Sequence, residues 1–228
     1  MASTCTSTSP LTRSVPPRST SPLLLLPVEL RLQIYTYLLS NLTTASSHTS
    51  KRISSSSTTT TPINAAILLV NRQLNSEATP ILYSQNTFLA HPSLLTSFPR
   101  LLPSLPPIRE PSVLGLIRRV HFTIRLDIDP AFSAEAARIA FSGLEELTIE
   151  LAQGYFLGAG CQNLRALESV RGVRRVNICG STMGFELYLG WLRGVMMSEP
   201  GVKVDSFKPV EECFWVDKFV KCNQLVVV

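Results

Sequence analysis

The stretch LLPVELRLQIYTYLL, residues 25–39, decides how the amino-terminal part of this chain folds. Pro27 suits the first position of a helix, where its missing N–H would have no partner in any case. Leu30, Ile34 and Leu38 recur every four residues and make one face of the predicted helix apolar. A helix this short is not stable by itself, so we expect its apolar face to dock onto another surface.

A second helix is predicted from residue 64 onward. Asn64 can cap it, and Ile67, Val70, Leu74 and Ala78 share one of its faces. The chain then runs through EATPILY to NTF, where we expect a short strand.

Between the two predicted helices lies a Ser/Thr-rich segment. Residues 40–61 contain 15 Ser or Thr among 22 positions, and residues 1–22 are also rich in Ser, Thr and Pro. Segments with so little to bury do not form a packed core, so we expect a disordered tail at 1–22 and a disordered linker at 40–61.

These motifs resemble the F-box-like proteins that filamentous fungi encode in large numbers. The first match is LPVEL followed by IYTYL, and the second is ILLVNRQL followed by EATPILY and NTF. The resemblance implies an F-box-like helical region at residues 23–90. It also implies that one set of residues faces an adaptor protein of a cullin-type ubiquitin ligase: Leu26, Pro27, Leu30, Ile34 and Leu38. In a standard F-box the helices follow one another closely, whereas here the linker separates them.

The remainder of the chain repeats a strand pattern three times. Alternating apolar residues occur at 117–124, at 144–151 and at 173–178, so the pattern returns at a nearly constant interval. The gaps between these strands are long enough for a helix. In the first gap, Ser133 can cap a helix at 134–141. A strand that returns at such an interval predicts an α/β fold with a short parallel β-α repeat, solenoid-like, at residues 91–228. This part resembles degenerate leucine-rich repeats.

The helical gaps and the end of the chain complete this interpretation. Leu164, Leu167 and Val170 share a stripe, and a last helix is predicted at 184–197. Gly190 and Gly194 are four residues apart there, which permits close helix packing. We expect a fourth strand at 202–204 and burial of the apolar tail 213–228 as a final strand.

Pairs of charged residues occupy equivalent positions in the three repeats: Arg118-Arg119, Glu145-Glu146 and Arg174-Arg175. Side chains alternate along a strand, so one member of each pair shares a face with its counterparts. We predict that Arg119, Glu146 and Arg175 are exposed and bind a partner, an unknown protein substrate. The other members should lie at the edge of the buried face. A self-neutralising ladder remains the alternative to a partner groove.

Other classes of site find little support. Asp127 and Asp129 are favoured as a loop before the Ser133 cap over a metal site, and the glycines at 154–160 lack the Lys-Ser/Thr of a phosphate loop. His121 has no nucleophile motif beside it. We therefore predict no enzyme, no catalytic residue and no cofactor.

The composition limits which classes of partner and which cellular compartment are expected. The formal charge is +5, yet residues 77–228 carry 15 basic and 15 acidic groups, so the excess lies in the Ser/Thr-rich first third. This favours a solvated tail over nucleic-acid binding. Five cysteines without paired spacing and three separated histidines predict free thiols and no zinc. No apolar run is long enough for a membrane span, so we expect a cytoplasmic or nuclear protein without membrane contact.

The predicted function is an F-box-like protein–protein interaction module, a substrate receptor of a cullin-type ubiquitin ligase. The alternative is a scaffold protein whose F-box-like helices pack only on its own repeats. The exposure of Leu30, Ile34 and Leu38 distinguishes the two, because a face consumed inside the fold leaves no surface for an adaptor.

Overall fold

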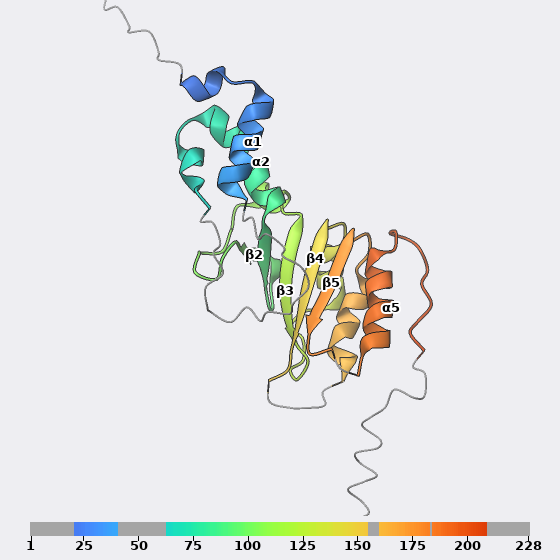
Figure 1. The fold of residues 1–228 in the computed structure, drawn as a ribbon. Coiled ribbons are helices and arrows are strands. Elements are labelled where there is room, and N and C mark those ends of the chain that lie inside the picture. The colour runs from blue at the N-terminus through green and yellow to red at the C-terminus, as the bar shows by residue number, and fades with distance from the viewer. Residues whose placement is uncertain (1–20, 41–62, 155–159, 183, 209–228) are drawn as a thin grey trace, which may run out of the picture.

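The protein has a mixed α/β fold built on a five-stranded, mostly parallel sheet (Figure 1). The computed structural model describes residues 21–40, 63–154, 160–182 and 184–208. The predicted linker, apart from Ser40, the predicted tail at 1–22, apart from Ser21 and Pro22, and the apolar segment 213–228 lie outside these residues.

Short helical segments precede the sheet in the described part of the chain: η1 (Pro22–Leu25), α1 (Val28–Leu39), η2 (Ala65–Leu69) and α2 (Arg72–Gln85). Pro27 is the cap of α1 rather than its first residue. The single helix predicted from residue 64 is wrong, because the helical segment is interrupted near Val70. The Asn64 side chain accepts a hydrogen bond from the amide of Ala66, whereas α2 begins with its own cap, Asn71, which accepts from the amide of Gln73.

The sheet has the strand order β2-β1-β3-β4-β5. Its strands are β1 (Thr87–His91), β2 (Leu95–Arg100), β3 (Arg119–Arg125), β4 (Glu146–Ala152) and β5 (Arg175–Gly180). The strand expected after residue 86 is β1, and it pairs antiparallel with β2, a strand that was not predicted from the sequence. The pairs β1–β3, β3–β4 and β4–β5 are all parallel.

The three repeated strand patterns are β3, β4 and β5, and their register keeps the interval of the sequence pattern. Arg119 lies opposite Glu146, and Glu146 lies opposite Arg175, so equivalent positions of successive repeats are direct neighbours. The intervening segments are α4 (Ala134–Phe141), with Ser133 as its cap as predicted, and η3 (Cys161–Ser169), a 3-10 helix. A short α3 (Pro111–Leu114) precedes β3, and α5 (Glu186–Met197) follows β5.

One face of the sheet forms the main core. Phe122 of β3 contacts the ring of Phe141 on α4, with ring centroids 5.2 Å apart, and the ring of Phe132 at 5.5 Å. η3 and α5 pack against the same core. The other buried residues of this sheet face alternate along the strands: Phe88, Val120, Ile124, Leu147, Ile149, Leu151 and Val176. A second, smaller core joins α1 to α2, and Tyr83 packs against both.

Two predictions near the carboxyl end are wrong. Residues 202–204 form no strand, because the chain after α5 runs back along that helix and places Phe207 against Tyr188 and Trp191. Gly190 and Gly194 do not mediate close packing. A Cβ added to either would meet nothing within 4 Å, so both face open space on α5.

Candidate partner-binding surfaces

The buried face of α1 is not the one that the leucine spacing suggests. Arg31, Tyr35 and Leu39, four residues apart, turn toward α2 and are buried. Tyr35 and Leu39 pack with residues of α2 that lie on its own inner face: Leu74, Ala78 and Leu82. Leu30 lies outside this contact and stays 45% exposed.

A charged cluster inside the α1–α2 contact explains this orientation. The Arg31 guanidinium donates to both carboxylate oxygens of Glu77, at 2.9 and 2.8 Å, and to the carbonyl oxygen of Leu26 at 2.6 Å. Tyr35 Oη donates to Glu77 Oε2 at 2.9 Å, and the Gln73 amide donates to Oε1 at 3.0 Å. Hydrogen bonds from Arg31, and then from Gln73, lower the pKa of Glu77 from 4.5 to about 2.

This cluster was not predicted from the sequence. A signal was present, because Arg31, Tyr35 and Leu39 follow helical spacing as regularly as the leucines do. An arginine in such a row is normally assigned to solvent, and its partner Glu77 lies far along the chain, beyond the Ser/Thr-rich segment.

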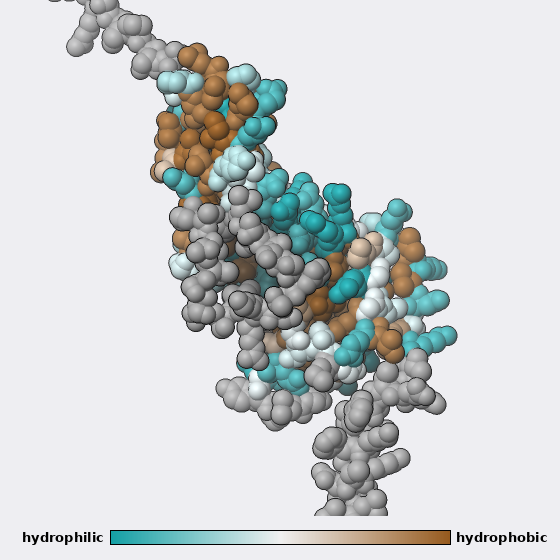
Figure 2. All heavy atoms as spheres, viewed as in Figure 1, coloured by the Kyte–Doolittle hydropathy of each residue, from teal (hydrophilic) through white to brown (hydrophobic). Residues whose placement is uncertain are grey.

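The five residues assigned to the adaptor differ in exposure. Pro27 and Leu30 are exposed, whereas Leu26, Ile34 and Leu38 are half-buried, and Leu38 packs against the small core. Four other apolar residues of the same region are more exposed than Leu30: Leu25 at 73%, Tyr37 at 76%, Leu69 at 89% and Val70 at 65%. Figure 2 shows the result as brown surface gathered over the amino-terminal helices. The apolar face of α1 is therefore only partly buried within the protein.

The residues that flank the predicted linker lie close together. The amide of Asn64 donates to the carbonyl oxygen of Leu38 at 2.9 Å, so the chain re-enters the helical region beside the end of α1. The buried side chain of Asn86 donates to the carbonyl oxygens of Leu39 and Leu82, at 2.7 and 2.8 Å. The ends of α1 and α2 are thus tied together despite the insertion between them.

The second candidate surface is the charged row across the open face of the sheet. Arg119, Glu146 and Arg175 lie side by side in register, as predicted. Arg175 is exposed and donates to Glu146 Oε2 at 3.1 Å, but Arg119 and Glu146 are half-buried rather than exposed. The other members also depart from the prediction, since Arg118 and Arg174 are exposed. Both come directly before the first residue of their strand.

Arg119 is occupied by contacts within the protein. Its Nη1 donates to the carbonyl oxygen of Gln85, the last residue of α2, at 3.0 Å. Its Nε lies 3.8 Å from Glu145. A cation at the end of a helix interacts favourably with the helix dipole, so Arg119 joins α2 to the sheet.

Other polar residues of the open face also pair with one another. His121 Nε2 lies 3.2 Å from Glu150 Oε2, and Thr123 donates to the same oxygen at 3.4 Å. Arg125 binds Asp127 through both carboxylate oxygens, and the Asp127 side chain is only 1% exposed. This ion pair lies against Gly154, where a Cβ would come within 2.6 Å of Arg125 Nη2. Asp127 is thus part of the structure of the loop before α4, as favoured from the sequence.

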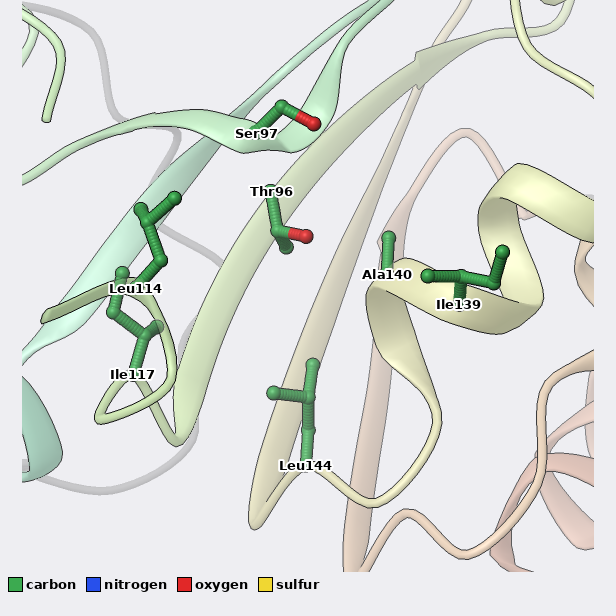
Figure 3. A pocket seen from close by; sticks show the side chains of 7 residues that line it. All are labelled: Thr96, Ser97, Leu114, Ile117, Ile139, Ala140 and Leu144. Carbon is green, nitrogen blue, oxygen red and sulfur yellow. The ribbon is translucent and has the colours of Figure 1, made fainter. Parts of the chain in front are cut away.

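A groove of about 310 Å³ lies beside β2 and α4 (Figure 3). Thr96 and Ser97 line one side, Ile139 and Ala140 line another, and the rest of the wall is apolar: Leu114, Ile117 and Leu144. No acid, histidine or cysteine of the described residues lines it.

Burial raises the thiol pKa of Cys161 and of Cys179, which lowers their reactivity at neutral pH.

Metal-binding clusters and membrane helices are not found where the chain is described. Over residues 21–40, 63–154, 160–182 and 184–208, no three His, Cys, Asp or Glu side chains gather as metal ligands. No helix in the same ranges is both long and apolar enough to span a bilayer. A scan against models of protein families finds no match, and searches of curated proteins and of solved structures find none either.

Proposed function

We propose that the protein is an F-box-like interaction module that acts as a substrate receptor of a cullin-type ubiquitin ligase. The observation that supports it is that Leu30 remains exposed, as do Leu25 and Tyr37 of the same helical region, while α1 and α2 pack through Arg31, Tyr35 and Leu39. An apolar patch of this kind on a helix is the feature that a partner protein would cover. The adaptor would dock there, on Leu26, Pro27, Leu30, Ile34 and Leu38.

The insertion between the helices is compatible with this role. The hydrogen bond from Asn64 to Leu38 and those from Asn86 keep α1 and α2 together at the point where the linker leaves and returns. The adaptor would therefore meet a packed pair of helices, as in a shorter F-box.

The sheet would present the protein substrate. In this proposal β3, β4 and β5 with their following helices are three turns of a degenerate leucine-rich-repeat-like solenoid. The support is the nearly constant interval between register partners and the packing of α4, η3 and α5 against one core. Such a receptor would work in the cytoplasm or nucleus and would perform no chemistry itself.

A pull-down of the full chain with the ligase adaptor tests the proposal. Leu30→Asp should abolish co-purification and leave the circular dichroism spectrum unchanged, because Leu30 is already in contact with water. Leu187→Asp is the matched control, since Leu187 is 58% exposed on α5, and it should retain the adaptor.

Two results would overturn the proposal. Binding that survives Leu30→Asp would remove α1 as the adaptor surface. A wild-type chain that does not retain the adaptor would favour the scaffold interpretation instead.

A further inference from the structure

The charged pairs at the start of β3, β4 and β5 do not neutralise one another completely. They comprise four arginines and only two glutamates. Glu146 is taken by Arg175 at 3.1 Å, and Glu145 is turned toward Arg119 at 3.8 Å. Arg119 and Arg175, the second arginine of each pair, thus interact with the two glutamates.

Arg118 and Arg174 remain without an acidic partner among the described residues. Both side chains are exposed, and within the described residues neither has an ion pair or a side-chain hydrogen bond. Figure 2 shows hydrophilic surface, in teal, over the ends of β3, β4 and β5 nearest α2. Charges are therefore paired in the row of Arg119, Glu146 and Arg175, as a self-neutralising ladder requires. In the row of Arg118, Glu145 and Arg174, the two arginines are not neutralised.

The backbone fixes the positions of the two free arginines. The carbonyl oxygen of Arg118 accepts from the amide of Glu145 at 2.9 Å, and the amide of Arg174 donates to Leu144 at 3.0 Å. The two residues come directly before β3 and β5, which β4 separates, so their Cα atoms are about 10 Å apart. A segment with several successive carboxylates spans this separation.

We propose that Arg118 and Arg174 form the docking site for an acidic segment of the substrate protein. The inference rests on the proposed function, because it names the chemistry of the partner that the sheet would present. It also moves the contact away from Arg119, which is held by Gln85 and Glu145. Complementary charges of this kind steer association and select among partners.

The test uses the full chain and a fluorescent hexaglutamate peptide, with anisotropy as the readout at low salt. The double variant Arg118→Ala/Arg174→Ala should raise the Kd about fivefold, since contacts between exposed charges are individually modest. The double variant Arg165→Ala/Arg193→Ala is the matched control. It removes the same charge from exposed sites on η3 and α5 and should leave the Kd nearly unchanged.

A reciprocal variant gives a gain of function. Arg118→Glu/Arg174→Glu should bind a hexalysine peptide more tightly than the wild type does. Equal losses in the two alanine doubles, or no gain in the reversed variant, would overturn the site, with folding of each variant checked by circular dichroism.

The outcome can be separated from that of the proposed function. The Arg118→Ala/Arg174→Ala protein should still retain the adaptor, and Leu30→Asp should still bind hexaglutamate. A failure of peptide binding with the adaptor retained would remove only the acidic docking site, whereas loss of the adaptor alone in the wild-type chain would remove only the ligase role.

Discussion

The guanidinium of Arg31 on α1 binds the carboxylate of Glu77 on α2 through two hydrogen bonds, 2.9 Å from Nε to Oε2 and 2.8 Å from Nη2 to Oε1. This bidentate pair sets the rotation of α1 about its own axis. Because Arg31 faces inward, Leu30 cannot. The exposure of the candidate adaptor surface therefore follows from the inward row of Arg31, Tyr35 and Leu39 and not from the leucine spacing.

The first prediction is a pH dependence of stability carried by Glu77. Its pKa in the folded protein is about 2, below the ordinary value of 4.5, chiefly because Arg31 and then Gln73 bond to the charged form. A lowered carboxyl pKa stabilises the fold fully above about pH 4.5, and this stabilisation is lost as the pH falls toward 2. The Tm of Glu77→Gln should thus lie well below that of the wild type at neutral pH, and the difference should shrink in acid.

Glu135→Gln is the control for this series. Glu135 pairs with Arg138 on the surface of α4, with 61% of its side chain exposed, and surface pairs contribute little. Thermal unfolding followed from neutral pH into acid checks both variants. A gap between Glu77→Gln and the wild type that stays constant in acid would show that the ion pair is not its cause.

The parts of the fold that the sequence predicted are those where burial alternates. Phe122 and Ile149 belong to strands with one face in the core, and such strands show period-two patterning. The antiparallel strand β2 was missed because it buries only Leu95 and Pro99 and contains a proline, which is tolerated there since β2 is at the edge of the sheet.

The candidate site was less predictable, for a different physical reason. The roles of Arg31 and Arg119 depend on Glu77 and Gln85, which are distant in sequence and come close only when α2 packs. Parity along β3 did place Arg119 beside Glu146. It could not reveal that the end of α2 would engage Arg119 and leave Arg118 exposed.

The second prediction concerns the glycines of α5. Gly190 and Gly194 are exposed within a helix, and an added Cβ meets nothing within 4 Å. Alanine at either position should stabilise the protein by about 0.5–1 kcal/mol, because glycine loses more backbone entropy in a helix. Chemical denaturation measures this. Gly201→Ala is the contrast, since its site is equally open but has φ +93°, so that variant should be less stable than the wild type.

The third prediction separates backbone strain from collision at the end of β5. Gly180 and Gly184 both have positive φ, at +97° and +88°. A Cβ at Gly180 would lie within 2.2 Å of the carbonyl oxygen of Leu151, whereas one at Gly184 meets nothing within 4 Å. Gly184→Ala should cost about 1–2 kcal/mol from strain alone, and Gly180→Ala should cost clearly more. Equal losses in urea titrations would mean that β5 shifts away from β4 without penalty.

The last prediction concerns the Ser/Thr-rich insertion. Asn64 hydrogen-bonds to Leu38, so the chain on either side of the insertion is already held together by the fold. Loop closure changes by only about 0.6 kcal/mol for each doubling of length, so deleting residues 43–58 should leave the Tm nearly unchanged or slightly higher. The same deletion should preserve adaptor co-purification, because it leaves Leu30 and the Arg31–Glu77 pair intact. A large fall in Tm would show that the insertion packs against the rest of the protein, and loss of the adaptor at an unchanged Tm would place part of the docking surface within it.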